Sequence, residues 1–258
     1  MSLTTKDYWD RHYRPGKGRR PVVDPRRDYL ADELLRLAGP HLPVPAPGRP
    51  ARLLEMGCGN SQWMPFFAAR GWQVTGLDYS ADGCRMAREN LEALGCAGEV
   101  SVRDFTAIGS EFNGRFEVVL SFGVVEHFES TAQAVGWFVR CVAPGGLLVT
   151  VVPNLTGGMG RWVKRIDAEI WRAHVPVDLA TLSAAHRAHG LEIIAEGYLA
   201  FFALGMLNFS GRRGGRFWSR AAYALDRLHL LGRRCTGIRP QSASWSSYAA
   251  VVARRGAL

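Results

Sequence analysis

The architecture of this 258-residue chain can be read from Leu53-Leu54-Glu55-Met56-Gly57-Cys58-Gly59-Asn60-Ser61. A short apolar run ends there in two closely spaced glycines, which let the backbone approach a ligand where a Cβ would collide. The helix expected over 62–70 points its positive end toward the same place. Asp78 closes a second apolar run, and an acid at the tip of the next parallel strand can accept hydrogen bonds from both hydroxyls of a ribose. These features predict a site for a nucleoside-containing ligand.

The motif departs from the dinucleotide-binding fingerprint G-x-G-x-x-G, because Gln62 stands at the third glycine position. It reads Glu-x-Gly-x-Gly-x-Ser instead, with Glu55 two residues before Gly57. The Glu55 carboxylate would repel a pyrophosphate, but not a ligand that carries an ammonium group. The motif resembles motif I of the class I S-adenosylmethionine-dependent methyltransferases, although Ser61 stands where many members have glycine.

This resemblance covers residues 50 to 200 and the final strand, and it implies S-adenosyl-L-methionine as the cofactor. It places Asp78 on the ribose, Asp104 at the adenine amino group, and Glu55 near the methionyl portion. An aromatic-rich N-terminal helix often folds over the cofactor in such enzymes, although here it could equally plug the core. The implied cofactor-binding residues are Trp9, Tyr13, Glu55, Gly57, Gly59, Asp78, Tyr79, Asp104, Phe105 and Ser121.

Apolar strands alternate with helices from Arg52 onward, which favours an α/β fold with a parallel sheet covered on both faces. Strands are expected over 52–56, 72–77, 99–103, 116–121, 146–152, 191–199 and 247–253. Helices are expected over 4–14, 25–37, 62–70, 80–94, 130–141, 179–189 and 216–231, with one more carrying Trp162 and Trp171. The resemblance implies a seven-stranded, mostly parallel, Rossmann-like sheet whose last strand is antiparallel.

The chain divides into two expected parts. Residues 1–50 form a helical N-terminal cap and a linker, which carries five prolines between positions 39 and 50 and is therefore expected to be extended. Residues 51–258 form the methyltransferase domain, with lid insertions at 154–177 and 200–244. Both insertions are rich in aromatic and apolar residues, so they could close a pocket and exclude water. Such a lid favours a compact small molecule over a polymer as substrate.

The net charge of +9 is concentrated in one segment. Between positions 205 and 239 eight arginines (212, 213, 216, 220, 227, 233, 234 and 239) stand against one acid, Asp226, so this segment contributes +7. A basic lid could attract an anionic substrate, a phosphate backbone or an acidic partner. The alternative is a solvated, arginine-rich surface in a chain encoded by GC-rich DNA.

Cysteine usage and the N-terminus indicate the compartment. Five scattered cysteines without a C-x-x-C pair argue for reduced thiols and against a zinc site, so no metal is expected. No apolar run is long enough to span a bilayer, and the charged N-terminus is not a secretory signal. We therefore expect a cytoplasmic protein, a monomer or homodimer, with no membrane partner.

The chemistry is expected in the loop 121–128, which leaves the carboxyl edge of the sheet beneath the cofactor. His127 is the candidate general base, since imidazole titrates in the useful range, and Glu126 could orient it or bind a cationic substrate. The Glu-His pair could also be structural, because it is common at this place in the family. His174, Tyr198 and Asn208 could orient a substrate or satisfy local hydrogen bonds.

The sequence also narrows the acceptor of the methyl group. The absence of an Asn/Asp-Pro-Pro-Tyr/Phe segment after the fourth strand disfavours methylation of nucleic-acid amino groups or of protein glutamine. We therefore predict transfer to an oxygen or nitrogen of a small molecule, in natural-product biosynthesis such as that of antibiotics. The alternatives are an RNA-modifying enzyme that uses the basic lid and a non-catalytic cofactor-binding module.

Overall fold

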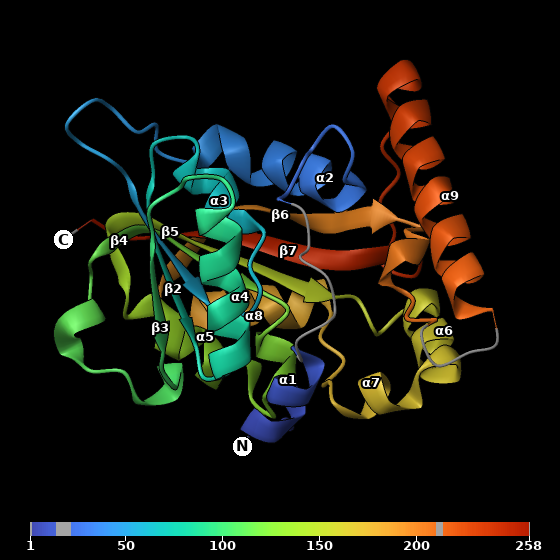
Figure 1. Cartoon of the computed structure of the whole chain (residues 1–258), viewed down its shortest axis with the longest axis horizontal. Helices are drawn as coiled ribbons and strands as arrows, with labels where there is room; N and C mark the ends of the chain where they lie inside the picture. The colour runs from blue at the N-terminus through green and yellow to red at the C-terminus, as the bar shows by residue number, and fades with distance from the viewer. Residues whose placement is uncertain (1, 14–21, 210–213, 258) are drawn as a thin grey trace.

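The computed structural model describes residues 2–13, 22–209 and 214–257 (Figure 1). The strands in these ranges are β1 (Arg52–Met56), β2 (Gln73–Asp78), β3 (Glu99–Val102), β4 (Phe116–Phe122), β5 (Val142–Pro153), β6 (Leu191–Phe201) and β7 (Ser246–Arg255). They form one sheet in the order β3-β2-β1-β4-β5-β7-β6. Strands β1 to β5 pair in parallel, whereas β7 lies antiparallel between β5 and β6. The predicted α/β sheet with an antiparallel last strand is thereby confirmed.

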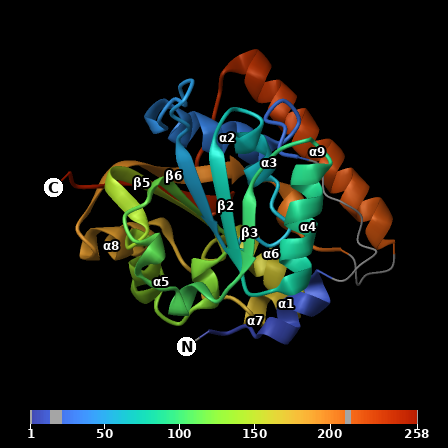
Figure 2. The ribbon, with the colours of Figure 1, turned by 60° about the vertical axis from the view of Figure 1, so that its left-hand side comes forward.

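The helices are α1 (Lys6–His12), α2 (Tyr29–Ala38), α3 (Trp63–Ala68), α4 (Ala81–Glu92), α5 (Thr131–Val139), α6 (Gly158–Ile166), α7 (Ala168–Arg172), α8 (Leu179–Ala188) and α9 (Gly215–Thr236). Both faces of the sheet are covered (Figure 2). Leu54 packs on one face with residues of α5 and α8, while Leu53 packs on the other with residues of α2 and α3. Neighbouring residues of a strand point to opposite faces, so the continuous apolar run supplies both layers.

Local capping explains most helix boundaries. The Ser80 hydroxyl accepts a hydrogen bond from the Gly83 N–H at 3.1 Å and begins α4, and the Asp178 carboxylate accepts from the Thr181 N–H and begins α8. Asp28 does the same for α2, so that helix begins four residues later than the predicted Pro25. Such caps satisfy N–H groups that have no partner inside the helix.

Three details of the prediction were wrong. The linker is not wholly extended, because Gly39–His41 forms a 3₁₀ turn that continues α2. The helix expected to carry both Trp162 and Trp171 is broken at Asp167, which leaves the helical region (φ −140°) and caps α7 with its side chain. The strand expected over 146–152 begins earlier, because residues 143–146 already belong to β5, whose pairing with β4 shifts register there.

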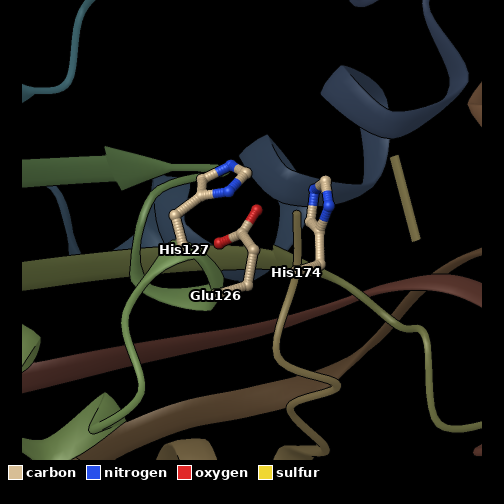
Figure 3. A group of neighbouring side chains, drawn as sticks. All are labelled: Glu126, His127 and His174. Atoms are coloured by element: carbon tan, nitrogen blue, oxygen red, sulfur yellow. The ribbon is translucent and has the colours of Figure 1, made fainter. Parts of the chain in front are cut away.

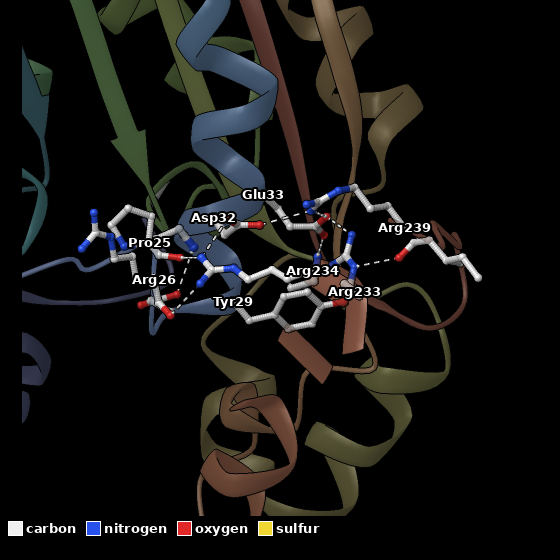
Figure 4. A network of polar contacts seen from close by, with 12 residues as sticks. Pro25, Arg26, Tyr29, Asp32, Glu33, Arg233, Arg234 and Arg239 are labelled. Carbon is white, nitrogen blue, oxygen red and sulfur yellow. Dashed lines mark hydrogen bonds and ion pairs between the residues drawn. The ribbon is translucent and has the colours of Figure 1, made fainter. Parts of the chain in front are cut away.

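Helix α9 is fastened to α2 by ion pairs (Figure 4). Arg233 is paired with Glu33, and both side chains are buried. Glu33 also accepts a hydrogen bond from the Ala200 N–H at 2.7 Å, which links the pair to β6. Arg234 and Arg239 lie 3.3 and 3.1 Å from the carboxylate of Asp32. Arg233 is therefore a buried structural residue, whereas Arg234 and Arg239 form their ion pairs at the surface. Arg212 and Arg213 lie outside the described residues.

None of the described helices combines the length and the apolar character needed to cross a membrane.

Replacing Arg233 by methionine should lower the free energy of unfolding by about 3–5 kcal/mol, because buried Glu33 would lose its hydrogen-bonded cation and keep only Arg239, which lies 3.7 Å away. The matched control is Arg220→Met on the exposed side of α9, which should change stability by less than about 0.5 kcal/mol. Urea unfolding followed by circular dichroism measures both. Equal losses in the two variants would show that the ion pair does not fasten the helix.

Candidate active site

The turn after β1 requires glycine at two positions, because the backbone conformation and the close neighbours leave no room for a side chain. Gly57 (φ +67°) and Gly59 (φ +43°) both adopt left-handed backbone conformations, which favour glycine. A Cβ on Gly57 would come within 2.6 Å of Val124 Cγ2, and one on Gly59 would collide with the Tyr13 hydroxyl. The N–H groups of Gly57 and Cys58 donate to the Leu77 carbonyl, so the turn is bonded to the end of β2.

The carboxylate of Asp78, the last residue of β2, is held by two backbone N–H groups. This carboxylate accepts hydrogen bonds from the Gly59 N–H at 2.9 Å and from the Ser80 N–H at 2.7 Å. The side chain is only 7% exposed, and burial raises the pKa of Asp78 to about 6 although both N–H groups oppose the shift. Its orientation is thus fixed before any ligand binds.

Glu55 lies behind the turn and does not line the cavity described below. Its carboxylate accepts a hydrogen bond from the Ser61 hydroxyl at 2.5 Å, and burial raises the pKa of Glu55 to about 8. The Ser61 oxygen in turn accepts from the N–H groups of Trp63 and Met64 at the start of α3. The serine that departs from the family motif therefore ties the turn, the acid and the helix together.

A cavity opens beside this turn. Six of the ten predicted cofactor-binding residues line it: Trp9, Tyr13, Gly57, Asp78, Tyr79 and Phe105. The remaining lining residues are Ser2, Thr4, Phe122, Gly123, Val124, His127 and Phe128. Sequence reasoning had singled out the loop 121–128 but missed Ser2 and Thr4, for which no motif gives a signal.

Four predicted residues are not on the cavity wall: Glu55, Gly59, Asp104 and Ser121. Asp104 is exposed, and its carboxylate accepts hydrogen bonds from the N–H and hydroxyl of Thr106. Ser121 is fully buried within the sheet, where its hydroxyl oxygen makes no hydrogen bond to any described residue. Contact of these four residues with a cofactor stays a prediction.

Helix α1 forms one wall of the cavity. Asp10 accepts a hydrogen bond from the Ser80 hydroxyl at 2.8 Å, which docks α1 on the start of α4. Trp9 donates its indole N–H to the Thr4 hydroxyl at 3.0 Å and stacks on Tyr13, with ring centroids 5.7 Å apart. The aromatic N-terminal helix thus faces the cavity and does not plug the core of the sheet.

His127 reaches the cavity from the 3₁₀ turn Val125–His127 that follows β4 (Figure 3). Its Nδ1 lies 2.7 Å from the carbonyl oxygen of Ala173. A carbonyl only accepts, so Nδ1 carries the proton and the ring lone pair is on Nε2. The edge-to-face contact with Trp9, at 5.0 Å between ring centroids, fixes the ring further.

Glu126 and His174 lie beside His127 (Figure 3). Glu126 is 1% exposed, its Oε2 has no hydrogen-bond partner among the described residues, and burial raises the pKa of Glu126 to about 8. The His174 ring centroid is 4.4 Å from that of His127, and burial lowers the pKa of His174. The potential ligand atoms of the three side chains lie within 4.8 Å of one another, a donor set that also suits a divalent metal. Sequence reasoning named all three residues but not their proximity.

The expected lid residues lie elsewhere. No described residue of 154–177 or 200–244 lines the cavity. His174 approaches it only through His127, Asn208 donates to Asp167 at 2.7 Å, and Tyr198 packs against the sheet core. The lid function of these insertions stays a prediction.

Comparison with known proteins supports the fold and the cofactor. Residues 24–196, well over half of the chain, match the family model of a methyltransferase domain. Curated relatives include the ubiquinone biosynthesis O-methyltransferases of Alkalilimnicola ehrlichii (33% identical; 48% of this chain and 46% of that protein) and of Sinorhizobium fredii (30% identical; 60% and 62%). The chain thus spans about half to three-fifths of the length of these relatives.

Solved structures share the fold at low sequence identity. They include magnesium protoporphyrin IX methyltransferase from Synechocystis PCC 6803 with bound SAH (TM-score 0.56, 15% identical; 97% of this chain and 93% of that chain). They also include the [4+2]-cyclase SpnF (TM-score 0.59, 18% identical; 88% and 82%). Since the family match covers most of the sheet and of the residues around the cavity, this chain belongs to the class I S-adenosylmethionine-dependent methyltransferases.

Proposed function

We propose that this enzyme transfers a methyl group from S-adenosylmethionine to an oxygen or nitrogen atom of a small molecule, in the biosynthesis of a natural product. The observation that carries the proposal is His127, whose protonated Nδ1 is held by the Ala173 carbonyl while the ring lines the cavity. The relatives named O-methyltransferase favour oxygen as the acceptor.

The residues around the cavity fit the cofactor. The Asp78 carboxylate, already oriented by two N–H groups, would accept hydrogen bonds from the ribose hydroxyls. Phe105 and Tyr79 offer aromatic surface for the adenine, and a Cβ on Gly57 would displace Val124, which also lines the cavity. Glu55 would act indirectly, by fixing the glycine turn through Ser61. The bound cofactor supplies an electrophilic methyl group on a sulfonium.

The remaining task of the protein is to align the acceptor and to remove its proton where necessary. His127 would take this proton on Nε2, because its Nδ1 is already protonated. Glu126, with its pKa raised to about 8, is mostly neutral at pH 7 and so adds little negative charge beside the imidazole. A general base requires the neutral form of the His127 imidazole.

RNA modification is the weaker alternative. Three of the six described arginines in the basic segment are engaged with Asp32 or Glu33, and none of the six lines the cavity. An RNA-binding role would need free cations arranged around the site. The basic segment therefore does not support a polymer substrate at this cavity.

The affinity for S-adenosylmethionine should rise as the pH increases through about 6, because deprotonation of Asp78 creates the charged acceptor for the ribose. In Asp78→Asn this pH dependence should disappear, and binding at pH 8 should weaken by about 2 kcal/mol. Calorimetric titrations between pH 5 and 8 measure both effects. A pH profile that is the same in the variant and the wild type would remove Asp78 from the ribose site.

Replacing His127 by alanine should lower turnover by about 10²–10⁴-fold while leaving cofactor affinity nearly unchanged, because only proton removal is lost. His189→Ala, at an exposed histidine that does not line the cavity, is the matched control and should keep full turnover. Single-turnover assays with isotopically labelled methyl donor give the rates. Retention of a third or more of wild-type turnover by His127→Ala would assign the loop to alignment alone.

Treatment with a metal chelator should leave turnover unchanged, because proton removal by His127 needs no metal. Activity is compared before and after incubation with EDTA and after re-addition of Zn²⁺, Mn²⁺ or Fe²⁺. Suppose instead that EDTA removes turnover and an added metal ion restores it in the wild type. If the metal then fails to restore turnover in Glu126→Gln and His174→Gln, these side chains are metal ligands.

A further inference from the structure

Helix α9 exposes an apolar face to solvent. Phe217, Leu228 and Leu231 are 66%, 63% and 59% exposed, and at 100° per residue they fall within about 60° of one another around the helix. Trp218 and Leu225, each about half exposed, extend this face on one side. These five residues are called the outer face of α9 below. Exposed apolar patches of this kind mark binding surfaces in soluble proteins.

The outer face is bordered by positive charge. Arg216, Arg220 and Arg227 fall within about 40° of one another along its other border. All three are exposed and form no ion pair with any described residue. The helix has one acid, Asp226, whose carboxylate is turned inward and accepts hydrogen bonds from the N–H groups of Leu204 and Gly205. No acid of α9 therefore neutralises this border.

The helix cannot turn its outer face inward without a large loss. Its opposite side carries Ala222, Leu230 and Arg233, all buried, and the Arg233–Glu33 pair fastens it to α2 (Figure 4). The helix stands at one end of the molecule, beyond the ends of β6 and β7 (Figure 1), and none of its residues lines the cavity. The outer face is thus not part of the cofactor site.

We propose that α9 docks the protein on an anionic lipid surface, with its outer face among the acyl chains near the headgroups and its arginines against lipid phosphates. A helix with one apolar face, an arginine border and a tryptophan is the sequence type that lies in the plane of a membrane interface. This docking is independent of methyl transfer. It revises the expectation of no membrane partner, which rested on the lack of a spanning run and does not address a peripheral contact.

A second copy of this chain is the less suitable occupant of the outer face. In an antiparallel pair of helices, equivalent borders face each other, so the arginine rows of two copies would lie side by side. Like charges at that spacing repel, and the rows carry no acids to offset them. A lipid surface with phosphate headgroups instead complements both the apolar face and its border.

The test is sedimentation of the full-length protein with vesicles of phosphatidylcholine alone and of phosphatidylcholine with 30% phosphatidylglycerol. Binding should require the anionic lipid and should weaken in high salt. Binding to anionic vesicles should weaken by about 100-fold in the arginine variant, which combines Arg216→Gln, Arg220→Gln and Arg227→Gln. Vesicle binding should be abolished in the apolar-face variant, Phe217→Ser/Leu228→Ser/Leu231→Ser. The control variant changes exposed positions outside α9 and should bind as the wild type does: Val44→Ser/Arg49→Gln.

Circular dichroism, the melting temperature and cofactor affinity should be unchanged in all variants, since the replaced side chains are exposed and lie outside the cavity. These readouts separate a docking defect from a folding defect or from a failure of the methyltransferase proposal. Absence of binding to anionic vesicles, or equal binding by the wild type and both α9 variants, would overturn the inference. A wild-type dimer that the apolar-face variant dissociates would assign the outer face to a second copy.

Discussion

Two backbone N–H groups, from Gly59 and Ser80, converge on the Asp78 carboxylate, and the carboxyl edge of the sheet is built around this convergence. The first comes from the turn after β1 and the second from the start of α4, so one side chain joins two βα connections. Ser80 then caps α4 with its oxygen and donates its hydroxyl proton to Asp10. A single acid thereby connects the glycine turn, a helix start and the N-terminal wall of the cavity.

The sheet and the glycine turn could be predicted because their signals are local. Continuous apolar runs specify strands that are buried on both faces, and closely spaced glycines specify a turn that no other residue can adopt without strain. The positions of Asp104 and Ser121 at the carboxyl edge were predicted on the same basis. Sequence position fixes where such a residue lies but not where its side chain points. Thr106 donates to the carboxylate of Asp104, and Ser121 is fully buried with its hydroxyl oxygen unbonded to any described residue.

The rest of the site depends on contacts between distant segments. His127 is oriented by the carbonyl of Ala173, which is 46 residues away, and its neighbour His174 comes from the same insertion. Helix α9 could be predicted as a basic helix, yet its orientation is set by Arg233 and Glu33, which are 200 residues apart. The amino-acid composition alone does not distinguish the arginines of this segment from one another. Tertiary contacts divide the six described arginines into three that pair with acids of α2 and three exposed ones that pair with no described acid.

The N-terminal wall of the cavity has a consequence for kinetics. Helix α1 has seven residues, and a helix of this length is not stable in water without tertiary contacts. The helix docks through Asp10 on Ser80 and through Trp9 on His127, so its docking and the enclosure of the cavity are one event. A ligand that contacts Trp9 and Tyr13 stabilises the docked helix by the same free energy that the docked helix adds to ligand binding. Undocking of these seven residues would open the cavity on the side of α1, so exchange of a ligand there is coupled to the motion of this helix.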